Sequence, residues 1–182
     1  MAELTHQRFE DFGSDNATTI RIGLVSDTHK LLRDEACTAL AGVDVILHAG
    51  DIGAMEVIEG LQAIAPTYTI RGNIDRAAWA ADIPDTASIR IGAVDVFMIH
   101  DVKTLSFDPA AKGYGVVMSG HSHTPRITHD NGVLYVNPGS IGPRRFKLPI
   151  AMAMMSVDGS GQPDAHLPSA QLIELDVTSP KK

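Results

Sequence analysis

The chain has 182 residues, a formal net charge of -7 at pH 7 and a single cysteine, Cys37. Its length suits one domain that buries a single core, and one cysteine excludes an intramolecular disulfide. The acidic balance argues against general nucleic-acid binding, which needs clustered lysine and arginine, and no apolar run is long enough to span a bilayer.

The first 19 residues, MAELTHQRFEDFGSDNATT, are polar and lack the basic flank and apolar stretch of a secretory signal. We therefore expect a flexible tail at residues 1–19, a single domain at residues 20–178 and a cytoplasmic protein. The lone Cys37 fits that compartment, because disulfides are rare there.

From Ile20 onward, strand-like and helix-like segments alternate. Strands are predicted for TTIRIGLVSD (18–27), VDVILHAGD (43–51) and TYTIRGN (67–73). Helical spacing of apolar residues lies between them, in LLRDEACTALAG (31–42) and AMEVIEGLQAIA (54–65). This alternation predicts a parallel βαβαβ half.

After Pro84 the pattern changes to strands with little helix between them. TASIRIGAVDVFMIH (86–100) predicts a hairpin about Gly92, and PRITHDNGVLYVNP (125–138) predicts one that turns at Asn131-Gly132. YGVVMSGH (114–121), LPIAMAMMSVD (148–158) and AQLIELDV (170–177) are also strand-like. We expect an antiparallel or mixed sheet that packs on the first half.

Five of the predicted strands end in side chains that bind metals. These are Asp27 and His29 after the first strand, then Asp51, Asn73, His100, and the pair His121 and His123. Ligands of open α/β sheets bind outside the carboxyl ends of the strands. Imidazole nitrogen suits borderline transition metals, whereas carboxylate and amide oxygens suit harder cations. The seven residues together predict a metal site.

Each residue alone has a simpler interpretation. Asp27 or Asp51 could cap the helix that follows it, and Gly72-Asn73 could be an ordinary turn. His48 lies inside a strand, where a buried, hydrogen-bonded histidine is the expected interpretation.

In this order the residues resemble the calcineurin-like metallophosphoesterase superfamily, whose pattern is D-x-H, G-D, G-N, a histidine after a strand, and G-H-x-H. The matching segments are SDTH (26–29), HAGD (48–51), RGNID (71–75), MIHD (98–101) and GHSHTP (120–125). NPGSIGPRRF (137–146) is similar to a segment of the small single-domain branch, which includes bacterial and archaeal phosphodiesterases. The resemblance covers residues 20 to 178.

The resemblance implies an α/β fold: a β-sandwich of two mixed sheets flanked by helices, in four αββα layers. It implies two divalent metal ions, one held by Asp27, His29 and His123 and the other by Asn73, His100 and His121, with Asp51 bridging them. Asp51, Asn73 and His100 would then be catalytic residues. Manganese is the metal we expect first, and the family also uses iron, nickel, zinc or magnesium.

The function implied is a metal-dependent phosphoesterase, and we expect a phosphodiesterase that acts on a small phosphoester through a hydroxide bridging the two metals. The metal charges would make the site locally positive in an acidic protein, so an anionic substrate remains reasonable. The alternative is a protein-binding scaffold of the same fold, similar to the retromer subunit, although a scaffold does not need all seven ligands. A homo-oligomer, dimer or tetramer, is a further expectation.

Two positions depart from the superfamily pattern. Ile74 stands where many members carry a histidine that protonates the leaving group, so we expect modest activity and a need for good leaving groups. Asp101 replaces a glycine and could bond a ligand imidazole, bind metal or face solvent; near the site it would disfavour dianionic monoesters.

Three more residues are candidates outside the ligand set. Asp75 is either a carboxylate partner of a ligand imidazole or a residue that stabilises a turn. Arg144 and Arg145 could bind a phosphate, and solvated surface arginines are the simpler alternative.

Overall fold

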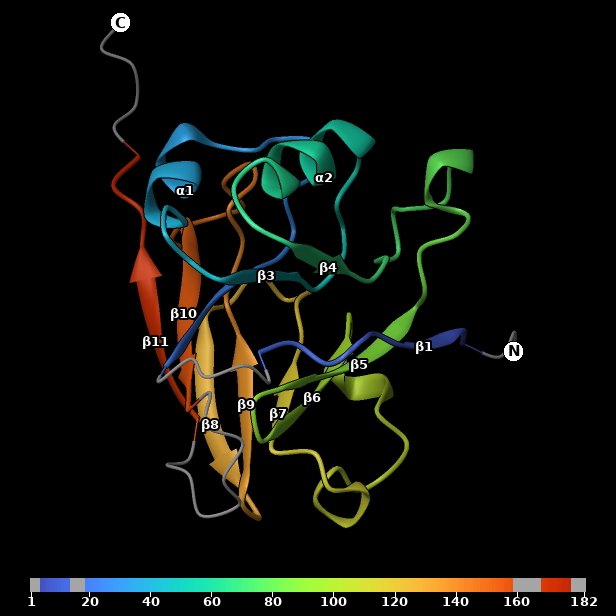
Figure 1. Cartoon of the computed structure of the whole chain (residues 1–182). Helices are drawn as coiled ribbons and strands as arrows, with labels where there is room; N and C mark the ends of the chain where they lie inside the picture. Colours follow the sequence, from blue (N-terminus) through green and yellow to red (C-terminus); the bar gives the residue numbers. More distant parts are fainter. Residues whose placement is uncertain (1–3, 14–18, 159–167, 178–182) are drawn as a thin grey trace, which may run out of the picture.

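The structure is a computed structural model in which residues 4–13, 19–158 and 168–177 are described. Two mixed β-sheets pack face to face (Figure 1). The six-stranded sheet has the order β1-β5-β6-β7-β9-β8, with strands β1 (His6–Arg8), β5 (Thr86–Ile91), β6 (Val94–Ile99), β7 (Val116–Met118), β8 (Arg126–Asp130) and β9 (Val133–Asn137). The five-stranded sheet has the order β11-β10-β2-β3-β4, with strands β2 (Ile20–Val25), β3 (Val45–His48), β4 (Thr67–Thr69), β10 (Ala151–Val157) and β11 (Ser169–Glu174).

The predicted βαβαβ half is confirmed. Strands β2, β3 and β4 are parallel neighbours, and the helices α1 (Asp34–Ala39) and α2 (Met55–Gln62) connect them. Apolar residues of α2 at helical spacing, Val57, Ile58 and Leu61, are buried against the sheet. Both helices therefore cover the face that points away from the six-stranded sheet (Figure 1).

The two predicted hairpins are also confirmed. They were predictable because each turn is formed by residues adjacent in the sequence. Strands β5 and β6 pair antiparallel across Gly92, which has a φ of 55°. Strands β8 and β9 pair across Asn131 and Gly132, with φ values of 46° and 77°. Two consecutive positive φ values are typical of the tight turns that Asn-Gly favours in hairpins.

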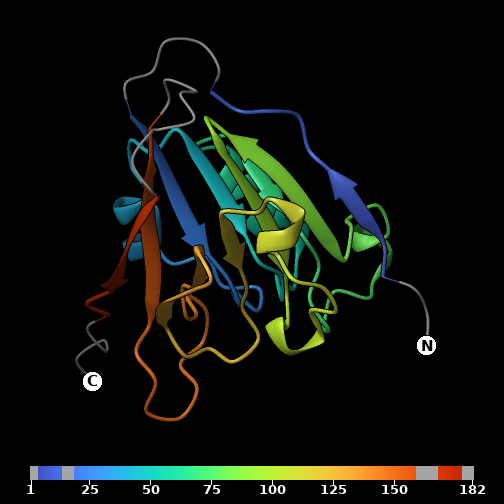
Figure 2. The ribbon, with the colours of Figure 1, turned by 90° about the horizontal axis from the view of Figure 1, so that it is seen from below.

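The last two strands differ from the expectation. Strands β10 and β11 do not extend the second-half sheet; β10 pairs antiparallel with β2, and β11 pairs with β10. Figure 2 shows β10 beside β2 and β11 beyond β10, on the side of the molecule opposite β1. The apolar residues of β10, such as Met152 and Met155, are buried there, which agrees with a role in the core.

The expected flexible tail contains a strand, so that prediction is wrong for residues 6–8. Strand β1 pairs parallel with β5, and Thr5 donates from its N–H and hydroxyl to Asp85. A strand at the edge of a sheet leaves backbone N–H and C=O groups without hydrogen-bond partners. Strand β1 supplies partners for these groups of β5. Residues 1–3 and 14–18 of the expected tail, and residues 159–167 and 178 of the expected domain, lie outside the described residues.

The main core lies between the sheets and is built from alternating positions of their strands. On the outer face of the six-stranded sheet, Phe97, Ile99 and Val117 are covered by Leu105, Phe107 and Tyr114. The expected fourth layer is therefore present, but it consists of the 3-10 turns η2 (Val102–Thr104) and η3 (Ala110–Lys112) rather than α-helix. A third turn, η1 (Ala78–Ala80), follows β4. None of the described helices is long and apolar enough to cross a membrane.

Candidate metal centre

The seven predicted ligands come together at one edge of the sandwich. They follow the carboxyl ends of β2, β3 and β4 in one sheet and of β6 and β7 in the other. Parallel strands point the same way, so their ends meet at a common edge. His29 and His123, 94 positions apart in the sequence, are thereby placed in direct contact.

The backbone turns sharply at most of these residues. Eight described residues other than glycine have a positive φ, and five of them are Asp27, His29, Asp51, His121 and His123. Such conformations cost about 1–3 kcal/mol each and persist at functional sites, where the surrounding structure enforces them. The turns direct the side chains toward one another instead of along the strand direction.

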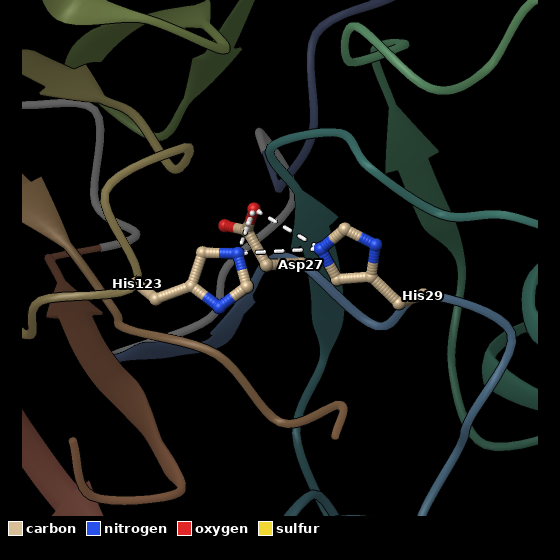
Figure 3. A group of neighbouring side chains, drawn as sticks. All are labelled: Asp27, His29 and His123. Carbon is tan, nitrogen blue, oxygen red and sulfur yellow. Dashed lines mark hydrogen bonds and ion pairs between the residues drawn. The ribbon is translucent and has the colours of Figure 1, made fainter. Parts of the chain in front are cut away.

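Asp27, His29 and His123 form the first group (Figure 3). The Nε2 atoms of His29 and His123 lie 3.2 Å apart. Asp27 Oδ1 lies 3.2 Å from His123 Nε2 and 3.9 Å from His29 Nε2. Three potential ligand atoms thus point at one small volume.

Asp51 and His100, with Asp27, form a second group, and His121 and Asn73 lie beside it. Asn73 Oδ1 lies 3.1 Å from His121 Nδ1, and the rings of His100 and His121 are 5.2 Å apart, edge to face. The two oxygens of Asp51 face different groups, with Oδ1 lying 3.3 Å from His100 Nε2 and Oδ2 lying 3.7 Å from His29 Nε2. Asp51 therefore occupies the position from which a carboxylate could bridge two ions.

Hydrogen bonds fix which ligand atoms are free. Asp27 Oδ2 accepts bonds from the Ser26 hydroxyl at 2.7 Å and from the His121 N–H at 3.0 Å. Nδ1 of His100 donates to the carbonyl of Ala49 at 2.7 Å, so Nε2 carries the lone pair of the neutral ring. Asp27 Oδ1 and His100 Nε2 consequently remain for another partner.

These two atoms provide the test of whether the residues fit a metal. Asp27 Oδ1 and His100 Nε2 are buried and have no hydrogen-bond partner among the described residues. A third such atom, His123 Nδ1, lies on the far side of its ring from Asp27 (Figure 3). Buried polar atoms are rarely left unpaired, and carboxylate and imidazole lone pairs that face one another repel unless a cation lies between them. The donor set therefore fits divalent metal ions.

The pKa shifts in the site differ from one residue to the next. Burial alone lowers the pKa of His100, but its contact with Asp51 and the charge of Asp27 outweigh this and raise the pKa above its usual value. Burial raises the pKa of Asp51, and contacts with His100 and the Ile74 N–H bring it below the usual value. Burial, with a smaller contribution from Arg145, lowers the pKa of His29.

His48 does not belong to the cluster. The N–H of Gly50 donates to its Nδ1 at 3.1 Å, so Nε2 carries the hydrogen and donates to the Thr28 hydroxyl at 3.0 Å. Complete burial lowers its pKa to about 4. The interpretation of His48 as a buried, hydrogen-bonded histidine agrees with these contacts.

Asp75 contacts backbone N–H groups and no ligand imidazole. It is buried, and its carboxylate accepts from the N–H groups of Ile52, Gly53 and Gly72 at 3.0, 2.8 and 2.8 Å. These bonds tie the loop that follows Asp51 to the loop that carries Asn73. Of the two interpretations of Asp75, the contacts agree with turn stabilisation.

Asp101 caps η2 and also faces the cluster. Its Oδ1 accepts from the N–H of Lys103 at 3.0 Å, and its Oδ2 lies 3.9 Å from His121 Nε2. A distance of 3.9 Å is too long for a hydrogen bond but short enough for electrostatic attraction to a protonated ring. Asp101 thus adds negative charge beside His121.

The two arginine candidates behave differently. Arg145 Nη2 lies 3.3 Å from His29 Nε2 and donates to it. Arg144 Nη1 instead donates to the carbonyl of Leu148 at 3.1 Å, which directs it back onto its own loop. Only Arg145 of this pair reaches the cluster.

The sequence alone did not reveal several supporting residues. Ser26 orients Asp27, and the exposed Arg76 bonds the Asn73 carbonyl through Nε at 2.8 Å. A β-carbon on Gly72 would overlap the Asp51 carboxylate, and one on Gly120 would overlap the Ser26 hydroxyl. The glycines of the G-N and G-H-x-H segments signalled these close approaches, whereas nothing local marked Ser26 or Arg76.

A sequence model of the calcineurin-like phosphoesterase superfamily domain matches residues 20–160. The chain belongs to this superfamily. The match spans all seven clustered side chains, and the expected fold of two mixed sheets is confirmed for this superfamily member.

Two of the similar proteins are archaeal. The chain is 30% identical over 150 residues to a probable metallophosphoesterase of Methanothermobacter thermautotrophicus, covering 76% of this chain and 86% of that protein. It is 30% identical over 147 residues to a phosphodiesterase of Methanocaldococcus jannaschii, covering 66% and 83%.

Two solved structures have the same fold. An archaeal phosphodiesterase aligns with a TM-score of 0.66 at 23% identity, covering 86% of this chain and all of that one. Vacuolar protein sorting 29 of Cryptosporidium parvum aligns with a TM-score of 0.69 at 19% identity, covering 87% and 99%. At such identities the likeness concerns the fold alone.

Proposed function

We propose that this protein is a metal-dependent phosphodiesterase that hydrolyses a small phosphoester with two divalent ions. The observation that carries the proposal is the convergence of seven ligand-type side chains, in which the buried lone-pair atoms Asp27 Oδ1 and His100 Nε2 have no other partner in the described structure. The phosphodiesterase name of one relative adds support.

In this proposal Asp27, His29 and His123 hold the first ion, Asn73, His100 and His121 hold the second, and Asp51 bridges the two. When bound, two divalent cations lower the pKa of a water shared between them and neutralise charge on phosphoryl oxygens. Four imidazoles among seven ligands favour a transition metal, with manganese first and iron, nickel, zinc or magnesium as alternatives.

The chain's own residues orient the ligands and the substrate. Ser26 and the His121 N–H hold Asp27 by one oxygen, which leaves the other for the ion. The lone pair of His29 Nε2 can serve one partner, so Arg145 would give up this hydrogen bond where His29 holds an ion. The N–H groups of Arg145 would then suit a phosphate oxygen.

Two features support a preference for diesters with good leaving groups. The backbone N–H of Ile74 bonds Asp51 at 3.1 Å, but its apolar side chain cannot protonate a leaving oxygen. A missing general acid commonly costs about 10²- to 10⁴-fold in rate unless the leaving group departs unprotonated. Asp101, at the His121 side, repels a dianionic monoester more than a monoanionic diester.

The test compares hydrolysis of bis-p-nitrophenyl phosphate and p-nitrophenyl phosphate by the metal-stripped protein, with and without added Mn²⁺. His121→Ala removes one ligand, and His129→Ala is the matched control, because His129 is an exposed histidine on β8. We expect metal-dependent diester cleavage that is lost in His121→Ala and retained in His129→Ala.

Absence of turnover with every divalent metal, in folded protein, would contradict the proposal. The alternative would then be a protein-binding scaffold, with the vacuolar protein sorting 29 structures as the fold precedent. Partner capture would be the next experiment. A cytoplasmic location and a homo-oligomeric state stay predictions from the sequence.

A further inference from the structure

We infer that Phe146 is a specificity residue that contacts the organic group of the substrate, and that this group is aromatic or similarly flat and apolar. The inference rests on the proposed function, because it assigns the non-phosphate part of a phosphodiester to a surface beside the metal centre. It adds a substrate class to the reaction.

Phe146 is available for contact with an external partner. Its side chain is 93% exposed, and its backbone is left-handed, with a φ of 52°. Large aromatic residues are usually at least partly buried, and left-handed backbone is a rare conformation for them. The described structure gives the ring no contact with another aromatic side chain.

The neighbouring residue connects Phe146 to the reacting atoms. Arg145 Nη2 is 3.3 Å from His29 Nε2, and the Cα atoms of Arg145 and its neighbour Phe146 are about 3.8 Å apart. A phosphate held by Arg145 would lie, with its ester oxygens, beside the loop that carries Phe146. The organic group on one of those oxygens then lies within reach of the Phe146 ring.

Other exposed apolar side chains lie near candidate ligands in the sequence. Large exposed apolar residues in the described structure are Leu4, Leu31, Met55, Ile74, Val102 and Phe146. Of these, Leu31, Ile74 and Val102 stand within two residues of the candidate ligands His29, Asn73 and His100. Single exposed apolar residues are ordinary, whereas several around one polar centre mark a binding surface.

Aromatic stacking is the interaction that the isolated ring offers best, because a flat ring face gains from another flat group beyond the area buried. The charged Arg145 beside it favours an anionic ester over a neutral aromatic compound. A phosphodiester with an aryl or nucleobase-like group combines both features.

The kinetic test uses two diesters with the same leaving group, bis-p-nitrophenyl phosphate and methyl p-nitrophenyl phosphate, so that only the retained group differs. For Phe146→Ala in the Mn²⁺-loaded full chain, we expect the ratio of kcat/KM values, aryl over methyl, to fall about 3- to 10-fold. Phe146→Trp should keep the wild-type ratio. Leu4→Ala, which removes an exposed apolar side chain elsewhere, should not change it.

A binding measurement separates this inference from the proposed reaction. Calorimetric titration with phenylphosphonate and methylphosphonate needs no turnover, and we expect Phe146→Ala to weaken only phenylphosphonate, by about 3- to 10-fold. If the wild type hydrolyses neither ester but shows this binding difference, the reaction proposal fails and the specificity inference stands.

Unchanged aryl-to-methyl ratios in Phe146→Ala, in both kinetics and binding, would overturn the inference. So would a wild type that binds both phosphonates equally or binds neither. Sedimentation velocity adds the remaining outcome: dissociation of an oligomer by Phe146→Ala with unchanged ratios would identify Phe146 as a subunit contact instead.

Discussion

Replacing Asp75 should weaken both the fold and the metal centre, because this one carboxylate connects two ligand loops. In Asp75→Ala, three backbone N–H groups lose their acceptor. Ile52 is buried, so leaving its N–H without an acceptor costs about 1–3 kcal/mol of stability. Gly53 and Gly72 are partly exposed, so water can hydrate their N–H groups and the cost is about 1 kcal/mol for each. The expected loss in free energy of unfolding is therefore about 3–5 kcal/mol.

Asp75→Asn should be intermediate. Its single amide oxygen can keep the two bonds made by Asp75 Oδ2, to Ile52 and Gly72, while its NH₂ group faces the Gly53 N–H. We expect a loss of about 1–2 kcal/mol. Because domains are stable by about 5–15 kcal/mol, both variants should fold near neutral pH.

The assay is equilibrium unfolding in urea, followed by circular dichroism and by the fluorescence of the only tryptophan, Trp79. Asp82→Ala is the matched control, since it removes one exposed carboxylate and should stay within about 0.5 kcal/mol of wild type. Metal affinity, measured by calorimetry, should fall about 10- to 100-fold in Asp75→Ala, as for other residues that orient metal ligands. A stability of Asp75→Ala equal to that of the control, or unchanged metal affinity, would refute the reasoning.

Three further changes have defined outcomes. Gly120→Ala places a methyl group against the residues that orient Asp27, so metal affinity measured by calorimetry should fall at least about tenfold with the fold retained by circular dichroism. The pKa of His48 is lowered from 6.5 to about 4, so on acidification the unfolded state binds a proton at this residue before the folded state does. Stability should therefore fall as the pH drops from about 6.5 to about 4, by at most about 1.4 kcal/mol per pH unit. When the urea midpoint is measured against pH, His48→Gln should flatten this part of the curve. Arg71 holds the pKa of Asp85 at about 2, so this ion pair contributes fully to folding stability above pH 4 and loses its contribution between about pH 4 and pH 2. Asp85→Asn should lower the free energy of unfolding by about 1–2 kcal/mol at pH 7, after allowance for solvent screening. It should also remove the loss of stability between about pH 4 and pH 2.

Each of these has a contradicting result. Unaltered metal affinity in Gly120→Ala would mean that the loop yields without moving the carboxylate. Equal pH profiles of wild type and His48→Gln would show that His48 does not titrate in the folded state as described. If the stability of Asp85→Asn still falls between about pH 4 and pH 2 as that of the wild type does, other carboxylates would be responsible for the fall.

The sequence by itself determined the features that depend on neighbouring residues. The Gly92 and Asn131-Gly132 turns were predictable because glycine and asparagine adopt positive φ at low cost. The candidate ligands were visible because each stands directly after an apolar strand, and parallel strands bring their carboxyl ends to one edge. The order of the motifs then indicated the superfamily, which the sequence model confirmed.

Only the tertiary structure decided the features that depend on distant segments. The pairing of β1 with β5 joins residues 80 positions apart, and that of β10 with β2 joins the chain's later strands to its first sheet. Neither partner carries a local signal of the other, because backbone hydrogen bonds in a sheet are alike at every edge. Arg144 and Arg145 are adjacent and chemically identical, and only the path of their loop directs one to His29 and the other to Leu148.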